Sequence, residues 1–173
     1  MANVNREPTV SFCSRTPEET TALGAELSRV WSARAPDQNL VLNLNGPLGA
    51  GKTAFVKGLA EGLGLPASLV SSPTFVLANQ YAGPQGARLY HVDFYRIEKL
   101  FELEEMGLYD MMEPGSVLAV EWGNRFSETL PLERIDLTLS REGPEGRRFE
   151  VRAASGWPEF VVSMWASRLE GSR

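Results

Sequence analysis

A glycine-rich stretch contains the residues of this sequence best suited to binding phosphate. Residues 46–53 read GPLGAGKT and satisfy the pattern G-x-x-x-x-G-K-[ST]. Glycines let consecutive backbone N–H groups point inward around an anion, and the positive end of a following helix favours a phosphate. Lys52, which we expect to be a solvent-facing charge, would neutralise the outer phosphates, and the Thr53 hydroxyl would reach Mg²⁺. The predicted nucleotide contacts here are Leu48, Gly49, Ala50, Gly51, Lys52 and Thr53.

The elements on either side of this stretch fit the same interpretation. Residues 39–45, NLVLNLN, are typical of a strand, and residues 52–63 are typical of a helix that Gly64 and Pro66 would end. A strand, a glycine turn and a helix in that order are the context that the pattern requires. The sequence therefore predicts a nucleoside-triphosphate site.

Two carboxylates are candidate partners for the metal ion that accompanies a nucleotide. Magnesium prefers oxygen ligands, and a carboxylate at the end of a neighbouring buried strand can supply one rigidly. Asp93 follows the apolar run LYHV, and Glu121 follows the run SVLAV. From the residues alone, either could be the ligand.

The rest of the chain alternates between strand and helix patterns. The first predicted helix, residues 16–31, has Thr16 as its N-cap, Pro17 at its first position and Glu19 completing a capping box. The other predicted strands are residues 9–15, 71–81, 87–96 and 116–122, with a hairpin formed by 134–139 and 147–152. Residues 100–112 have helical spacing, and 157–171 are predicted to form a closing helix.

These elements predict an α/β protein. The expected fold resembles that of P-loop nucleoside triphosphatases: a mixed, mostly parallel sheet flanked by helices, with a C-terminal β-hairpin. No linker, internal repeat or low-complexity tract divides the 173 residues, so residues 1–173 are predicted to be a single domain.

Composition excludes several classes of protein. The net charge of -5 argues against a free-standing nucleic-acid binder, which normally has a basic surface. The single cysteine, Cys13, allows no intrachain disulfide. The first ten residues lack the pattern of a secretion signal, and no apolar run approaches the roughly 18 residues that span a bilayer. We therefore expect a cytoplasmic protein without a membrane partner.

Five motifs, in order and spacing, resemble the bacterial TsaE family, formerly YjeE. They are GPLGAGKT, SSPTF, LYHVDFYR, ELEEMGLYD and VLAVEWGNRF. The resemblance runs from about residue 10 to residue 152 and leaves the role of residues 156–173 open. It implies a small ATPase needed to form N6-threonylcarbamoyladenosine in tRNA.

The resemblance also implies roles for individual residues. Lys52 would bind the β- and γ-phosphates of ATP, and Thr53 with Glu121 would hold Mg²⁺. Asp93 would lie near the γ-phosphate and orient the attacking water. Trp122 would be an aromatic beside the nucleotide, although a tryptophan there could equally belong to the core or the sheet edge. Residues 72–75 would form a switch-like loop.

Other roles stay open. Adenine contacts would fall near Thr16 and Pro17, although helix capping explains both without a ligand. Arg96 and Arg125 are candidates for either transition-state charge or surface ion pairs. His91, the single histidine, is expected to be structural, since no second His or Cys nearby supports a zinc site.

Three classes of function remain possible from the sequence. The first is a slow ATPase subunit that acts with the TsaB and TsaD proteins and meets tRNA only through their complex, as the resemblance implies. The second is a small-molecule kinase, although no arginine-rich lid is visible between Glu98 and Leu118. The third is a nucleotide-dependent binding switch that hydrolyses little. The ATP-consuming step, the stoichiometry and the oligomeric state are not encoded in any motif.

Overall fold

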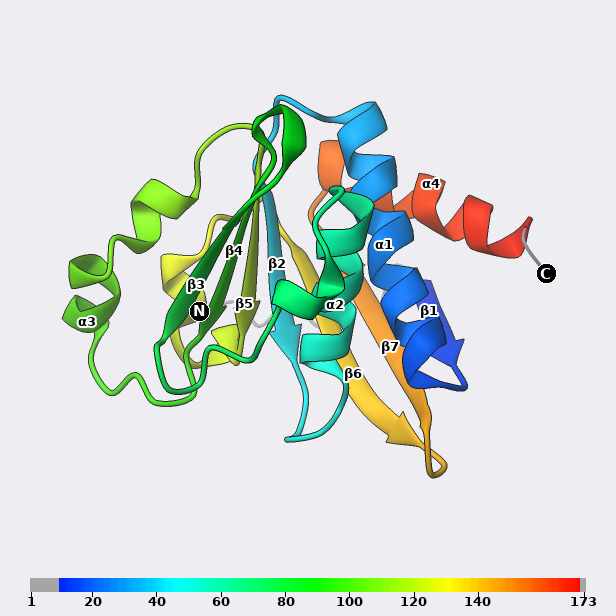
Figure 1. The fold of residues 1–173 in the computed structure, drawn as a ribbon, viewed down its shortest axis with the longest axis horizontal. Helices are drawn as coiled ribbons and strands as arrows, with labels where there is room; N and C mark the ends of the chain where they lie inside the picture. Colours follow the sequence, from blue (N-terminus) through cyan, green and yellow to red (C-terminus); the bar gives the residue numbers. More distant parts are fainter. Residues whose placement is uncertain (1–9, 172–173) are drawn as a thin grey trace.

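A computed structural model describes residues 10–171 of the chain (Figure 1). The described part leaves out residues 1–9 and 172–173. The absence of a secretion signal was predicted mostly from residues 1–9, so that prediction lies outside the described residues. The strands are β1 (Val10–Ser14), β2 (Leu40–Asn45), β3 (Ala78–Ala82), β4 (Arg88–Asp93), β5 (Ser116–Glu121), β6 (Ile135–Glu142) and β7 (Gly146–Ala153). The α-helices are α1 (Pro17–Arg34), α2 (Lys52–Gly62), α3 (Leu100–Glu105) and α4 (Trp157–Glu170). The 3-10 helices are η1 (Ala67–Leu69), η2 (Pro84–Gly86), η3 (Leu108–Met111) and η4 (Gly123–Thr129).

All the strands belong to one seven-stranded sheet, in the order β1-β7-β6-β2-β5-β4-β3. The four central strands β6, β2, β5 and β4 pair in parallel. The pairs β1–β7, β6–β7 and β3–β4 are antiparallel. The mixed α/β sheet and its C-terminal hairpin are confirmed, with the parallel pairs confined to the centre.

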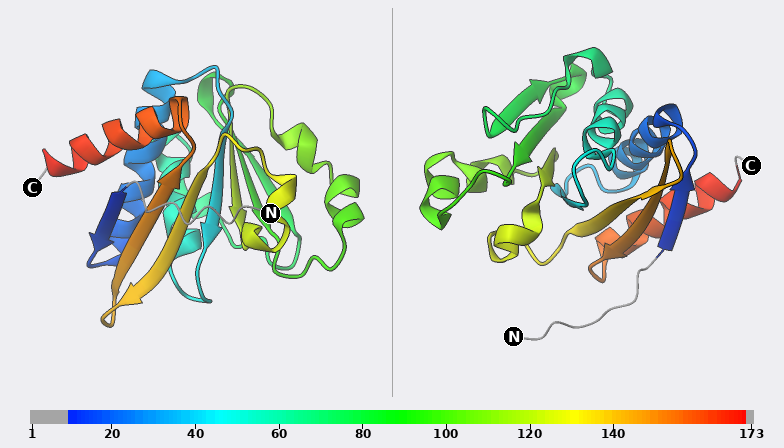
Figure 2. Two further views of the ribbon diagram at one scale, coloured as in Figure 1. Left: turned by 180° about the vertical axis from the view of Figure 1, so that it is seen from behind. Right: turned by 90° about the horizontal axis from the view of Figure 1, so that it is seen from below.

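Helices cover both faces of this sheet, as Figure 2 shows. Apolar side chains of α1, α2 and α4 pack on one face with Leu42 of β2 and Ala119 of β5. Residues of α3, η3 and η4 pack on the other with Val41 and Val120. Since successive side chains of a strand point to opposite faces, the central strands need apolar residues at nearly every position, as the sequence has them.

Helices α1 and α2 pack against each other through small residues. A Cβ atom at Gly24 would lie 2.2 Å from the Phe55 carbonyl oxygen, and one at Gly58 would lie 1.9 Å from the Thr21 carbonyl oxygen. Only glycine permits that approach. It brings the beginning of α1 beside the beginning of α2, where the Thr21 hydroxyl donates to the Ala54 carbonyl oxygen over 3.3 Å.

The predicted strand 71–81 was wrong in its first part. Only Ala78–Ala82 is a strand, and residues 71–77 form a loop. Pro73 has no N–H for a strand ladder, and its carbonyl oxygen accepts from both Val76 N (3.0 Å) and Leu77 N (2.7 Å). Leu77 then adopts a positive φ of 67°, which ends the turn and begins β3.

Two smaller predictions also needed correction. The helical run 100–112 is divided between α3 and η3, because Gly107 adopts a φ of 77° between them. Thr16 caps α1 as predicted, accepting from Glu19 N over 3.2 Å. However, the Glu19 carboxylate accepts from Arg15 N over 2.7 Å, whereas a capping box would have it accept from the N–H of Thr16 itself.

Within residues 10–171, no helix is both long and apolar enough to cross a membrane.

Candidate functional site

The loop between β2 and α2 presents backbone amides in the way its sequence predicts. Gly49 and Gly51 have φ values of 73° and 100°, in the left-handed region that favours glycine. Gly51 caps α2 without any side-chain acceptor, and the first helical bond runs from Phe55 N to the Gly51 carbonyl oxygen at 3.0 Å. The amides before Phe55 therefore have no partner within the helix, which makes this end of α2 suited to an anion.

Lys52 does not project into solvent, contrary to expectation. Its side chain is buried, and Nζ donates to the carbonyl oxygens of Gly46 (2.8 Å) and Pro47 (3.1 Å). Nζ also lies 4.6 Å from the centre of the Trp122 ring. Burial lowers the pKa of the Lys52 ammonium group, although the negative charges of Glu121 and Asp93 act to raise it. The lysine is held beside the loop by neutral acceptors.

Strand alternation puts the acidic candidates on the face that α2 covers. Asp93 and Glu121 are paired in register at the ends of β4 and β5, and both are buried. The Thr53 hydroxyl, at the second position of α2, donates to Oε1 of Glu121 over 3.0 Å. The two predicted metal ligands therefore meet although they lie far apart in sequence.

A buried histidine contacts the same carboxylate. Nε2 of His91 lies 2.9 Å from Oε1 of Glu121. Burial acts to raise the pKa of Glu121, but the hydrogen bond and electrostatic contact with His91, the hydrogen bond from Thr53 and the charge of Lys52 outweigh it and lower that pKa below its ordinary value. Glu121 is thereby kept as an anion.

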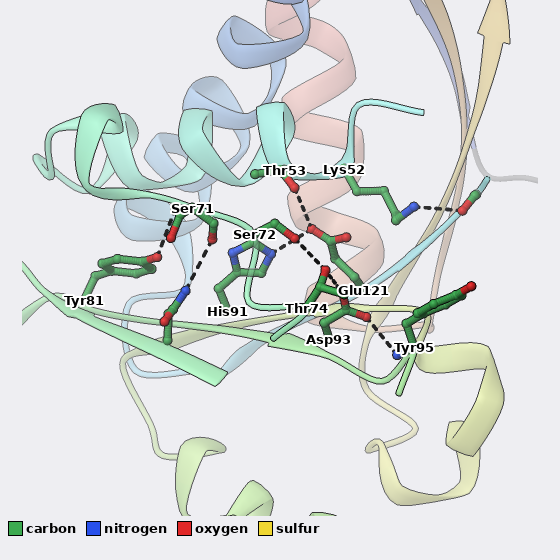
Figure 3. A network of polar contacts seen from close by, with 12 residues as sticks. Lys52, Thr53, Ser71, Ser72, Thr74, Tyr81, His91, Asp93, Tyr95 and Glu121 are labelled. Carbon is green, nitrogen blue, oxygen red and sulfur yellow. Dashed lines mark hydrogen bonds and ion pairs between the residues drawn. The ribbon is translucent and has the colours of Figure 1, made fainter. Parts of the chain in front are cut away.

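Asp93 is connected to the loop 71–77, as Figure 3 shows. The Thr74 hydroxyl donates to Oδ2 of Asp93 over 2.7 Å, and the backbone N–H of Tyr95 donates to Oδ1 over 2.8 Å. The Ser72 and Thr74 hydroxyl oxygens are 2.8 Å apart. Both oxygens of the predicted water-orienting carboxylate are therefore engaged by the protein.

One cavity of about 600 Å³ lies at the carboxyl ends of β2, β4 and β5, and the glycine-rich loop, Lys52, Thr53, Asp93 and Glu121 all border it. Its lining includes residues 48–54, Ser72, Thr74, Phe75, Asp93, Tyr95, Glu121 and Trp122. Thr16 and Pro17 do not belong to the lining. They begin α1, which packs beside the start of α2, and their contact with adenine stays a prediction.

The donor atoms of this cavity fit magnesium bound together with a nucleotide. Thr53 and Glu121 offer oxygen ligands only, which is what Mg²⁺ prefers. Within residues 10–171, no group of three or more His, Cys, Asp or Glu side chains is placed to hold a metal unaided. An ion here would need phosphate oxygens and water to complete its shell, as Mg²⁺ in nucleotide sites does.

The sequence analysis did not identify two arginines that lie beside the glycine-rich loop between β2 and α2. Nη2 of Arg141 lies 2.6 Å from the position that a Cβ atom would take on Gly49. Nε of Arg147 lies 3.4 Å from the equivalent position on Gly51. Both come from the hairpin β6–β7, for which no motif signalled a role. Only the pairing of β6 with β2 could have indicated them.

The other two arginine candidates have partners away from the metal ligands. The Arg125 guanidinium donates to the carbonyl oxygens of Tyr95 and Ile97, the latter over 3.0 Å. It therefore fixes the segment that follows Asp93. The Arg96 guanidinium lies 4.4 Å from the centre of the Phe75 ring, and Phe75 lines the cavity described above.

Comparisons with known proteins lead to one family. The model described as threonylcarbamoyl adenosine biosynthesis protein TsaE matches residues 14–149. The tRNA threonylcarbamoyladenosine biosynthesis protein TsaE of Bacillus subtilis is 42% identical over 145 residues, covering 84% of this chain and 86% of that protein. The Haemophilus influenzae protein of the same name is 33% identical over 153 residues, covering 87% and 95%. The crystal structure of Bacillus subtilis YdiB matches with a TM-score of 0.68 at 32% identity, covering 92% of this chain and 95% of that one.

Proposed function

This chain belongs to the TsaE family of threonylcarbamoyl adenosine biosynthesis proteins, and from that premise we propose that it is a Mg²⁺-dependent ATPase. The substrate of the chain is ATP, and ATP hydrolysis supports the formation of N6-threonylcarbamoyladenosine in tRNA. One observation carries the proposal: Lys52, Thr53, Asp93 and Glu121 border a single cavity at the carboxyl edge of the sheet. Ligands of open α/β sheets bind at that edge.

Binding the triphosphate uses the loop amides and Lys52. The amides at the start of α2 cradle the β-phosphate, and the Lys52 ammonium group moves from the carbonyl oxygens of Gly46 and Pro47 to the outer phosphates. Phosphate oxygens are charged and compete well against neutral carbonyl oxygens for a cation. Thr53 and Glu121 hold Mg²⁺, which when bound offsets the charge of the phosphates.

Hydrolysis requires Asp93 to accept a hydrogen bond from the attacking water. In this structure its Oδ2 atom already accepts from Thr74. A water oriented by Asp93 would share this carboxylate with Thr74, so the position of the loop 71–77 would affect how that water is held. We therefore propose that the isolated chain hydrolyses ATP slowly, below about one turnover per second.

Acceleration comes from partners that dock on this loop. Phe75 is 81% exposed and Val76 is 62% exposed, next to the residue that engages Asp93. A protein surface covering them would move or order the loop, as switch segments of GTPases are ordered. We propose the TsaB and TsaD proteins as these partners, by family resemblance, with tRNA reached only through the complex and in the cytoplasm.

Single-turnover hydrolysis tests the proposal. The chain is mixed with γ-labelled ATP and Mg²⁺, alone and with TsaB and TsaD, and the labelled products are separated by thin-layer chromatography. We expect slow release of free phosphate that rises at least about tenfold with the partners. Transfer of label to a small acceptor would indicate a kinase, and nucleotide binding without phosphate release under either condition would indicate a binding switch. Fast hydrolysis indifferent to partners would contradict the subunit role.

A further inference from the structure

His91 is a buried polar residue whose only side-chain hydrogen bond among the described residues is to Glu121. The His91 side chain is completely buried in β4. Its Nε2 atom meets Oε1 of Glu121 at 2.9 Å, whereas its buried Nδ1 atom has no partner. A core histidine that serves only packing leaves a polar atom unsatisfied, at a cost that an apolar residue would avoid. The contact with Glu121 is the feature that sets His91 apart from such a residue.

The direction of this hydrogen bond follows from the chemistry of the two groups. A carboxylate that holds Mg²⁺ must be ionised, so its oxygens can only accept hydrogen bonds. His91 must therefore carry its proton on Nε2 and donate it to Oε1. This N–H approaches from β4, within the sheet, and fixes the carboxylate from one side.

The position of the Glu121 carboxylate in turn fixes the orientation of the Thr53 hydroxyl. The Thr53 hydroxyl has one proton, and it is donated to the same Oε1 atom over 3.0 Å. The lone pairs of the hydroxyl oxygen must then point away from Glu121, which leaves them available to a cation. Because Oε1 accepts both protons, Oε2 is left without a hydrogen bond among the described residues. One donor thus aligns both predicted metal ligands.

We propose that His91 is a positioning residue for Mg²⁺-nucleotide binding, which orients Glu121 directly and Thr53 through Glu121. The inference rests on the proposed nucleotide-binding function. It predicts that loss of the Nε2 donor weakens the contribution of Mg²⁺ to nucleotide binding and leaves binding without Mg²⁺ nearly unchanged. Residues that hydrogen-bond a metal ligand typically affect metal affinity by about 10- to 100-fold when they are replaced.

Three substitutions at this position distinguish the effect of losing the hydrogen-bond donor from the effect of losing the volume of the imidazole ring. His91→Gln keeps an amide N–H at about the reach of Nε2. His91→Asn is equally polar but one methylene shorter, so its amide falls short of Glu121. His91→Leu removes the donor altogether. Tyr90→Phe is the matched control, because Tyr90 lies next in the same strand and donates instead to Glu113 over 2.7 Å.

The experiment is calorimetric titration of each folded variant with ADP, with and without Mg²⁺. We expect the gain in affinity from Mg²⁺ to fall at least about tenfold in His91→Leu and His91→Asn, and to stay within about threefold of wild type in His91→Gln and Tyr90→Phe. Electron paramagnetic resonance of Mn²⁺ with ADP gives a second measure, and its spectrum should change in the Asn and Leu variants but not in His91→Gln or Tyr90→Phe. If the Leu variant does not fold, the Gln and Asn pair decides.

Equal Mg²⁺ gains in the Gln and Asn variants would overturn the inference, as would equal losses with and without the ion. Adding His91→Asn to Glu121→Gln should lower the remaining gain no further, and an additional tenfold loss would show that His91 does not act through Glu121. A wild-type protein that gains no affinity from Mg²⁺ would contradict the proposed function itself. A normal wild-type gain that no His91 variant alters would remove only the role of His91.

Discussion

The two ends of the β4–β5 pair hold charged side chains in opposite ways. At the amino ends, the Arg88 guanidinium donates to Oε1 of Glu113 over 2.6 Å, and the Tyr90 hydroxyl donates to the same oxygen over 2.7 Å. At the carboxyl ends, Asp93 and Glu121 are neighbours in register. Among the described residues, neither of these two carboxylates forms an ion pair with a lysine or arginine. The nearby cation, Lys52, is bonded to carbonyl oxygens instead.

This difference distinguishes a structural ion pair from a binding site. At the amino end, Glu113 and Arg88 form an ion pair with each other. At the other end two carboxylates lie close together and accept hydrogen bonds only from hydroxyl, imidazole and amide groups, while the nearby Lys52 is bonded to loop carbonyl oxygens. A further cation would stabilise such a pair. Under the proposed function, Mg²⁺ and phosphate would bind at the carboxyl end, so substitutions at the two ends should have different effects.

The largest effect should come from Lys52→Ala. Removing the charge that pairs with the outer phosphates should weaken ATP binding by about 100-fold or more, while the fold survives because the loop carbonyls lose only one donor. Titration with ATP and circular dichroism measure the two quantities. Arg88→Ala, at the amino end, is the control and should bind ATP normally. Unchanged turnover by Lys52→Ala would disprove the role of this loop.

Asp93→Asn should act on rate more than on affinity. The amide keeps an oxygen for the Tyr95 N–H but is a far weaker acceptor for the attacking water, so single-turnover hydrolysis in the partner complex should slow about 100-fold. ATP affinity should change by less than about threefold, since Asp93 is not a predicted phosphate ligand. Parallel losses of rate and affinity would make Asp93 a binding residue.

Glu121→Ala should selectively weaken binding in the presence of Mg²⁺. A metal ligand contributes only when the ion is bound, so ATP affinity should fall at least about tenfold with Mg²⁺ and little with a chelator. Calorimetric titration under both conditions measures the difference. Equal losses in the two conditions would mean that Glu121 is structural.

The smallest effect should be on the pH dependence of stability, through the Arg88–Glu113 ion pair at the amino ends of β4 and β5. Hydrogen bonds from Arg88 and then Tyr90 lower the pKa of Glu113 below its ordinary value. The resulting stabilisation is fully present above the ordinary carboxyl pKa and is lost as the pH falls through the lowered one. Glu113→Gln should therefore lower the melting temperature slightly at pH 7 and progressively less below pH 4.

Thermal unfolding of wild type and Glu113→Gln across this pH range measures the effect. ATP binding at pH 7 should be the same in both proteins, because Glu113 lies at the opposite end of the strands. A loss of ATP affinity in Glu113→Gln would show that the two ends are coupled and would remove the contrast between them.

Much of the fold could be predicted from local sequence because its signals act over a few residues. The glycines of the phosphate loop, the Thr16 cap and the hairpin around residues 142–146 need only neighbouring positions to form. Prediction failed where one residue overrode a longer pattern. The carbonyl oxygen of Pro73 closes a turn within an apparent strand, and Gly107 divides an apparent helix.

The candidate site divides in the same way. The sequence by itself predicted Lys52 and Thr53 as phosphate and metal contacts, and it named Asp93 and Glu121 as strand-end acids, since these signals follow from short patterns. Only the tertiary structure decided that Glu121 meets both Thr53 and His91, and that Lys52 is buried against loop carbonyls.

The arginines of the hairpin show the physical reason most clearly. Arg141 and Arg147 lie beside Gly49 and Gly51 because β6 pairs with β2, a contact between residues about 90 positions apart. Local patterns set which backbone conformations a segment adopts. The order of strands depends on burying both faces of one sheet at once, and no segment carries that information alone.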